Sequence, residues 1–523
     1  MEHRARKKRR MEHANRRTAP GGRTPIREER EGLRHNRRWS RIGLLLLLTG
    51  LGFVVMGYHP GLEDDGIYLP AVKADLHPAL YPYNSAFFRL QVQATVFDGT
   101  MANFVRATHL PLSWAEMLWQ LLSIFVVLWA LHRIARKLFA EPGAQWAAVA
   151  LVSAMLTLPV SGTALYLMDQ HLHPRNIAAA MILVAVDRVL EGRRWQAAAV
   201  LAPAFLMHPI MAAMGISFCV FLGAALSETS PVRLRALRSS AASAAPLGWI
   251  LEPPNPVWKK ALDTRTYYYL YKWTWYEWLG ALAPLAMFWG LWRWARRRNE
   301  TVLARFALAV FAYGVFQQAL AMALLAPPQW LRLAPLQPMR YLQLVYFFMV
   351  LIGGGLLGRL VLRGKVWRWA VFLLAANGGM MWSQCAQYPA SRHLEWPGRK
   401  AESEWLQAFR WIRAHTPVDA YFALDPYYLR APGEDYHGFR ALAERSQLAD
   451  AIKDAAAVTQ VPELAERWDR QVTAEQGWQH FRLADFERLK REFGVNWVVV
   501  ERAQRAGLQC PWQGGSLAVC EIP

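Results

Sequence analysis

A series of apolar segments, each close to the length that crosses a bilayer, constrains this chain of 523 residues more than any other feature. About 20 apolar residues span the hydrocarbon core as a helix. Since no water is available there, backbone groups must be satisfied internally, and helices achieve this within one segment. The sequence therefore predicts a mainly α, polytopic membrane protein with about 11 transmembrane helices. The expected spans are residues 42–58, 112–131, 144–160, 175–190, 195–208, 210–226, 239–251, 278–294, 301–325, 341–358 and 367–382.

Clusters of Lys and Arg between these segments predict the direction of each crossing, because such residues accumulate in cytoplasmic loops. With eleven spans, all these clusters lie on the cytoplasmic side of the membrane. Segment 239–251 is short for a span, and it is included only because outward and inward crossings must alternate. The assignment predicts a multi-pass protein of a bacterial inner (plasma) membrane, with a cytoplasmic N-terminus and a periplasmic, or extracytoplasmic, C-terminus. The clusters lie at residues 133–137, 193–194, 233–238, 296–298 and 359–365.

The N-terminal tail, residues 1–41, carries 15 Lys or Arg against 5 Glu. It has few apolar residues to bury, so we expect it to be disordered and cytoplasmic. The sequence pI of about 10.1 would also suit a nucleic-acid-binding protein. The basic run directly precedes a hydrophobic span, where attraction to anionic lipid explains it. The interpretation therefore includes membrane lipid as a partner and no nucleic acid.

Three regions follow from this pattern: the tail 1–41, a transmembrane domain 42–384 with a first outer loop at 59–111, and a C-terminal domain 385–523. The last region alternates helical and β-rich runs, which predicts a small extracytoplasmic α/β domain. Cys510 and Cys520 bracket the stretch CPWQGGSLAVC, whose Gly-Gly turn can bring two strands together. In an oxidising compartment a disulfide between them is chemically permitted, and we predict one.

Three consecutive acids, Glu63, Asp64 and Asp65, lie just beyond the first span. One of these carboxylates can act as a general base. Alternatively, Asp64 and Asp65 can hold a divalent cation such as Mg²⁺ or Mn²⁺ through hard oxygen ligands. The competing interpretation is a solvated Asp-Asp-Gly turn that only shapes the loop.

Other polar and aromatic residues stand at the same predicted membrane face. Arginine suits a phosphate group, because its guanidinium binds phosphate bidentately, although an arginine at a span end can equally snorkel to the interface. The histidines can bind substrate or satisfy carbonyls freed at a helix break. Aromatic rings can stack on a sugar or simply anchor the interface. The candidates for substrate binding are Tyr68, His77, His173, Arg175, His208 and Arg340.

The position of the acid triplet after the first span resembles the GT-C superfamily of membrane glycosyltransferases, whose signature is a pair of acids in the first outer loop. The stretches HPRNIAAAMILVAV, GRRW, FLMHPIMA and QPMRYLQLVYF resemble an uncharacterised bacterial branch with that fold. In the C-terminal region, WIRAHTPVDAYFALDP and GFRALAERS resemble the same group. The resemblance covers nearly the whole chain after residue 42.

This resemblance implies a hexosyl or pentosyl transferase that takes sugar from a polyprenyl-phosphate donor and passes it to an extracytoplasmic glycan, lipid or protein. Asp64 or Asp65 would deprotonate the acceptor hydroxyl or hold a metal, while Arg175 and Arg340 would stabilise the phosphate leaving group. Two alternatives stay open. A transporter or flippase of a lipid-linked or small polar molecule would use the same cavity without chemistry, and a non-catalytic membrane assembly protein would not need the acids.

Overall fold

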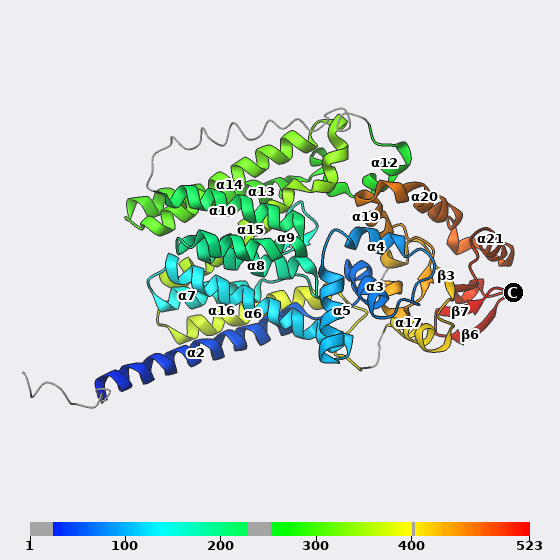
Figure 1. Cartoon of the computed structure of the whole chain (residues 1–523), viewed down its shortest axis with the longest axis horizontal. Helices are drawn as coiled ribbons and strands as arrows, with labels where there is room; N and C mark the ends of the chain where they lie inside the picture. Colours follow the sequence, from blue (N-terminus) through cyan, green and yellow to red (C-terminus); the bar gives the residue numbers. More distant parts are fainter. Residues whose placement is uncertain (1–24, 228–252, 400–402, 432) are drawn as a thin grey trace, which may run out of the picture. The chain divides into compact units, whose positions relative to one another are not determined.

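A computed structural model describes residues 25–227, 253–399, 403–431 and 433–523, with the side chains of 25–39 and 328 excepted. The described chain is mainly helical and ends in a small sheet (Figure 1). It forms two compact units, residues 1–48 and 49–523, and the second contains every site residue discussed below. The expected span at 239–251 lies outside the described residues.

Apart from α2, which begins well before the first apolar segment, the helices of the predicted transmembrane region begin and end near the bounds that the apolar pattern predicts. Several begin with proline in the first turn, where its missing N–H costs nothing. These helices are α2 (Pro25–Met56), α6 (Leu112–Leu138), α7 (Pro142–Ala154), α8 (Pro174–Leu190), α9 (Arg194–Met207), α10 (Pro209–Leu226), α13 (Trp275–Arg297), α14 (Thr301–Leu325), α15 (Leu342–Leu357) and α16 (Val366–Gln387). In Figure 1, α6, α8, α9 and α10 run beside one another, as do α13 and α14.

Four stretches within the described residues are long and apolar enough to cross a membrane: Leu112–Leu138, Pro209–Leu226, Thr301–Leu325 and Gln329–Leu362. They indicate a membrane protein. The count of eleven crossings stays a prediction. Helix α7, for example, has 13 residues and is followed by a short hairpin of β1 (Pro159–Val160) and β2 (Leu165–Tyr166). At a rise of about 1.5 Å per residue, such a helix is too short to cross the hydrocarbon core alone.

The prediction of disorder for the tail is wrong from residue 25 onward, since α2 begins at Pro25 and continues into the apolar segment. Its polar part, PIREEREGLRHNRR, is rich in Arg and Glu, which are good helix formers. Residues 1–24 lie outside the described part of the chain.

The first loop, expected as a polar connection, folds into three helices: α3 (Asp65–Leu76), α4 (Ala86–Val92) and α5 (Phe97–Thr108). Their apolar residues form one buried cluster together with Leu172, just before α8, and Ile177 in its first turn. Contacts join α3 to α18 (Phe439–Ala443) and α4 to α19 (Lys453–Gln460), so this loop packs against the C-terminal region.

The C-terminal region has the predicted α/β character. Its five-stranded sheet has the order β4-β3-β5-β7-β6, with β3 parallel to β4 and β5, and β7 antiparallel to β5 and β6. Alternate residues of β5 enter two cores, with Val499 packing toward α17 and Val498 toward α21. The elements are α17 (Glu404–His415), β3 (Tyr421–Ala423), β4 (Ser446–Gln447), α20 (Ala465–Ala474), α21 (Leu483–Phe493), β5 (Trp497–Glu501), β6 (Gln509–Gln513) and β7 (Leu517–Glu521).

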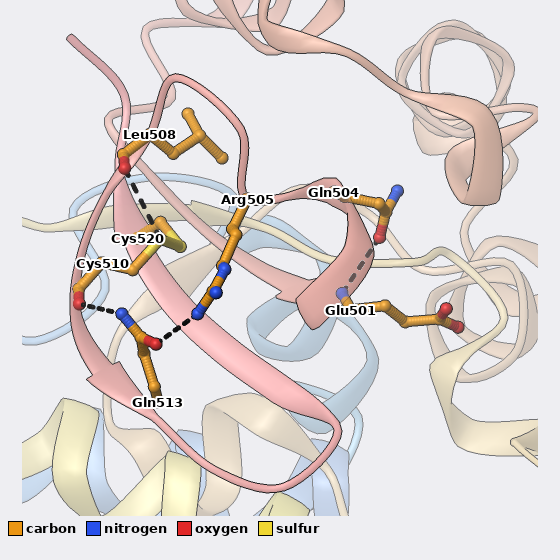
Figure 2. The surroundings of a disulfide bond; sticks show 7 residues. All are labelled: Glu501, Gln504, Arg505, Leu508, Cys510, Gln513 and Cys520. Atoms are coloured by element: carbon orange, nitrogen blue, oxygen red, sulfur yellow. Dashed lines mark hydrogen bonds between the residues drawn. A yellow bond between two sulfur atoms is a disulfide. The ribbon is translucent and has the colours of Figure 1, made fainter.

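The predicted disulfide between Cys510 and Cys520 is confirmed, with 3.9 Å between the two Cα atoms. Figure 2 shows it bridging the edge strand β6 and its neighbour β7, which the Gly-Gly turn joins. Two further cysteines of the described chain are unbridged: Cys219 is buried in α10 and Cys385 is exposed on α16.

A carboxylate clamp fastens the start of the first loop to the C-terminal region. Glu395 accepts hydrogen bonds from His59 Nδ1 at 2.8 Å and from His437 Nε2 at 2.9 Å. Burial opposes ionisation of Glu395, but the two imidazoles outweigh it and lower its pKa to about 2.

Close to this clamp, two glycines allow the backbones of the first loop and the C-terminal region to touch. Gly438 donates its N–H to the Gly61 carbonyl, and a Cβ on Gly438 would lie 2.7 Å from the Gly66 Cα. Only glycine permits this approach.

Candidate functional site

The turn that carries the acidic triplet directs its three side chains differently. Glu63 adopts a φ of 53°, in the left-handed region that non-glycine residues rarely occupy. Its N–H donates to the Tyr436 carbonyl at 3.0 Å, which anchors the turn on the C-terminal region. Asp64 is the N-cap residue of α3, and Asp65 is the first residue of that helix. The reversal at Glu63 leaves Glu63 and Asp64 facing one cavity while Asp65 enters the protein core.

Lys453, the first residue of α19, bridges the two cavity-facing acids. Its Nζ donates to Glu63 Oε2 and, at 3.1 Å, to Asp64 Oδ1. Asp450 accepts the backbone N–H groups of Ile452 and Lys453, which positions this first turn. Lys453 is 8% exposed, so two carboxylates take the place of the water that would otherwise solvate its ammonium group.

Arg175 enters the same site from the first turn of α8. Its guanidinium makes a two-point ion pair with Asp169, at 2.7 and 2.6 Å, and reaches Asp64 Oδ2 at 3.5 Å. Removal from bulk water opposes ionisation of Asp64. The charges of Lys453 and Arg175 nevertheless hold its pKa well below the usual range. Asp64 is therefore an ionised carboxylate with a partly exposed face.

Two His-Pro pairs place histidines at helix starts beside the cavity. His173 Nδ1 accepts the Arg175 N–H at 3.0 Å, and His208 Nδ1 accepts the Met211 N–H at 3.4 Å. Because Nδ1 acts as an acceptor in both, a neutral ring carries its proton on Nε2. The His173 Nε2 lies 3.7 Å from Asp64 Oδ2. Each histidine thus combines capping of a helix with presentation of an N–H donor.

Arg340 differs from the other cations of the site in its environment. It belongs to η5 (Pro338–Tyr341), immediately before α15. Among the residues that the structure describes, its side chain makes no hydrogen bond or ion pair, and its buried Nε lacks a partner. A partly buried guanidinium without a protein acceptor has unused capacity for an anion.

The acids, cations and histidines described above surround a cavity of about 1100 Å³. Aromatic residues such as Tyr166, Tyr267 and Trp258 form further parts of its wall, together with apolar side chains of β1 and β2. Among the residues predicted from sequence, the cavity is lined by Glu63, Asp64, Tyr68, His173, Arg175, His208 and Arg340.

Two predicted site residues lie elsewhere. Asp65 is 3% exposed and accepts the Gly61 N–H at 2.6 Å, because one residue further along α3 rotates its side chain toward the interior. Burial raises the pKa of Asp65, a shift opposed by His171. His77 is the exposed C-cap residue of α3 and is absent from the cavity lining. It lies at the opposite end of the helix from Asp64.

The predicted metal site at Asp64 and Asp65 does not fit the structure. The two carboxylates diverge, and Asp64 already faces Lys453 and Arg175, whose positive charges would repel a divalent cation. Throughout the described residues, no group of three His, Cys, Asp or Glu side chains is arranged to hold a metal ion. The Asp64 carboxylate, predicted as a metal ligand, is therefore part of an ion-pair network within the protein.

Sequence reasoning missed two residues of this network, Asp169 and Lys453. Asp169 precedes Arg175 in the stretch MDQHLHPR, and a buried arginine at a membrane boundary implies an acidic partner nearby. That signal was sufficient to suggest Asp169. Lys453 has no local signal, since its partners lie 390 and 389 residues away.

Comparisons with known proteins add little to this geometry. No family model matches the chain, and no curated protein matches it in sequence. It is similar to an Archaeoglobus fulgidus oligosaccharyltransferase tethered to an acceptor peptide with the NVT sequon (TM-score 0.43, 11% identity, covering 88% of this chain and 69% of that one). It is also similar to AglB of that organism in complex with an inhibitory peptide and a dolichol-phosphate (0.43, 11%, 89% and 70%). Likenesses of this size carry no argument about function.

Proposed function

We propose that the chain is a GT-C-like glycosyltransferase that moves a sugar from a polyprenyl-phosphate-linked donor to an acceptor hydroxyl or amide. The observation that carries the proposal is one cavity that presents an ionised carboxylate, Asp64, together with the guanidinium of Arg340, which lacks a partner among the residues that the structure describes. A transferase of this class needs both groups: a proton acceptor for the incoming nucleophile and a cation for the departing phosphate.

The proposed reaction is a single displacement at the anomeric carbon. The acceptor oxygen or nitrogen forms a bond to that carbon while the bond from the carbon to the phosphate oxygen breaks. The proton of the acceptor passes to Asp64, and the electron pair leaves with the polyprenyl phosphate. Because Asp64 is a weak base in this environment, we expect proton transfer late in the displacement, when the acceptor has become acidic.

Arg340 is the preferred phosphate ligand because Arg175 is already engaged by Asp169. As charge develops on the leaving phosphate, a guanidinium in a partly desolvated cavity stabilises it more strongly than water does. The Nε2–H groups of His173 and His208 are further donors, and Tyr68 lies edge-on to the His173 ring at 4.7 Å. Arg175 holds Asp64 in place and keeps it ionised.

The lipid-linked donor is supported by the setting of the cavity. Helices that begin at its wall, α8 and α10, belong to the apolar bundle, and one of them is long and apolar enough to span a membrane. The acid turn after the first apolar segment also matches the GT-C pattern. With the basic clusters on the cytoplasmic side, the cavity would face the extracytoplasmic side of a bacterial plasma membrane.

The test compares cells that produce the wild-type chain with cells that produce Asp64→Asn, by mass spectrometry of lipid-linked sugars and envelope glycans. Asp75→Asn is the matched control, since Asp75 also lies on α3, pairs with Arg89 at 3.9 Å and is absent from the cavity lining. We expect one glycan product to disappear with Asp64→Asn only. An unchanged profile at equal protein levels would reject the proposal, and the transporter alternative predicts no new glycosidic product at all.

A further inference from the structure

Lys453 is buried in a place where a lysine is locally unfavourable. It is the first residue of α19, and the N-terminus of a helix carries partial positive charge that disfavours a cation. Its side chain is also 10% exposed, and an ammonium taken out of water loses its hydration. The two carboxylates of Glu63 and Asp64 offset both costs.

The partner turn carries its own local cost. Glu63 holds a left-handed φ of 53°, which is unfavourable for a residue with a side chain. This conformation brings Glu63 and Asp64 to the same ammonium. A buried lysine at a helix N-terminus and a left-handed glutamate, from distant parts of the sequence, are thus joined by one ion pair. Such conflicts between local preference and final structure concentrate at functional sites.

Each carboxylate around Asp64 already faces a cationic side chain of the protein. Glu63 and Asp64 face Lys453, while Arg175 is shared between Asp64 and Asp169. A divalent cation entering between Glu63 and Asp64 would meet the Lys453 ammonium at hydrogen-bond distance from the same oxygens. Coulomb repulsion at that separation is strong even at an effective dielectric constant of about 20.

We propose that Lys453 is the built-in cation of this site: it occupies the place between Glu63 and Asp64 that a divalent metal would otherwise take, so that the site works without one. This inference rests on the proposed function only in taking Asp64 as the working carboxylate. Lys453 is a positioning residue, which orients Asp64 and keeps it ionised. Because it lies on α19, docking of the C-terminal region completes the site.

The test measures Mn²⁺ binding to the purified full chain in detergent micelles by electron paramagnetic resonance, without any sugar. For the wild type we expect no bound Mn²⁺ that depends on Asp64. Lys453→Gln removes the charge and adds an amide oxygen beside two carboxylates, all suitable ligands for a hard cation. Loss of the ammonium should tighten Mn²⁺ binding by at least ~10-fold. The second substitution Asp64→Asn should abolish that gain.

Two matched variants separate charge from structure. Lys453→Arg keeps the cation and should bind no Mn²⁺. Lys260→Gln removes a lysine from a surface pair with Asp469, at 3.0 Å, and should behave as wild type. The proposal is overturned if the wild type binds Mn²⁺ and Asp64→Asn abolishes it, a result that stands even if the lysine variants fail to fold. It is also overturned if folded Lys453→Gln gains no binding. Neither result depends on glycosyl transfer, so the proposed function is judged separately.

Discussion

Arg175 and Arg340 line the same cavity but differ in what surrounds each guanidinium. Arg175 is paired with the buried Asp169, so Arg175→Gln leaves an uncompensated carboxylate and should destabilise the protein by about 3–5 kcal/mol. Arg340 has no such partner within the described residues, so Arg340→Gln should leave the melting temperature almost unchanged. It should instead weaken binding of a short-chain prenyl phosphate by ~10-fold or more, the value of one charge-assisted hydrogen bond.

The two effects are read out on the same purified variants, by thermal unfolding in detergent and by calorimetric titration with the prenyl phosphate. The contrast between the variants decides the assignment. Equal losses of stability for both variants, or unaltered phosphate binding by Arg340→Gln, would show that Arg340 is a structural cation.

A second residue-scale prediction concerns Asp450, which positions the first turn of α19. Burial and the neighbouring Asp454 raise the pKa of Asp450 to about 6. In the unfolded chain an aspartate titrates near about 3.9, so between about pH 4 and 6 the folded state retains a proton that the unfolded state has lost. The retained proton on Asp450 therefore adds to the free energy of unfolding below about pH 4. This contribution is lost as the pH rises through about 6.

Asp450→Asn has no proton to lose, so the variant should show a shallower fall of melting temperature across this window than the wild type. Differential scanning fluorimetry of the full chain over a pH series measures the slope. Asp469→Asn, at a more exposed position of the same region, serves as the control. Identical slopes for wild type and Asp450→Asn would contradict the assigned shift.

At this scale the sequence located the acid turn but could not rank its members. Glu63, Asp64 and Asp65 are adjacent carboxylates with similar chemistry. Which of them face the cavity depends on the left-handed φ of Glu63 and on where α3 begins. Likewise Lys453 could not be found, because its role exists only after two segments nearly 400 residues apart have packed together. Arg175 and Arg340 were identifiable because charges at membrane boundaries are uncommon.

At the scale of elements, the hairpin of β6 and β7 depends on its disulfide more than the rest of the sheet does. Strand β6 is an edge strand with a register irregularity between Gln509 and Trp512, whereas β7 pairs with both β6 and β5. Replacing both Cys510 and Cys520 by Ser should cost about 2–3 kcal/mol, given the short closed loop. Hydrogen exchange should accelerate in β6 first.

Cys385→Ser is the control for this experiment, because Cys385 is an exposed, unbridged cysteine on α16. It should leave exchange throughout the sheet unchanged. Uniform acceleration of β3, β5 and β7 along with β6 in the double variant would mean that the disulfide stabilises the whole region, contrary to the local role argued here.

Helices and strands were predictable because periodic apolar patterns report burial directly. The run NWVVV is continuous rather than alternating, and β5 is indeed covered on both faces. The folding of loop 59–111 into three helices could not be predicted from span-length apolar segments, because these helices have only 12, 7 and 12 residues and bury their apolar side chains in one cluster. Crossing number is also weakly determined, because several bundle helices are short.

At the scale of the whole molecule, the site is shared between distant parts of the chain. The turn before α3 supplies Glu63 and Asp64, the start of α8 supplies Arg175, the segment before α15 supplies Arg340, and α19 supplies Lys453. The clamp at Glu395 holds the turn against the C-terminal region. The account therefore predicts that neither the helical bundle nor the C-terminal region alone has a working site.

The most direct measurement is release of polyprenyl phosphate or diphosphate by the purified full chain, reconstituted in vesicles with lipid-linked sugars and glycans extracted from the producing cells. Mass spectrometry follows the lipid product. The account predicts release by the wild type and by Asp75→Asn, and a loss of at least ~100-fold with Asp64→Asn, the lower range for removal of a general base. Release at the wild-type rate by Asp64→Asn, or donor that only changes leaflet without losing its sugar, would contradict it.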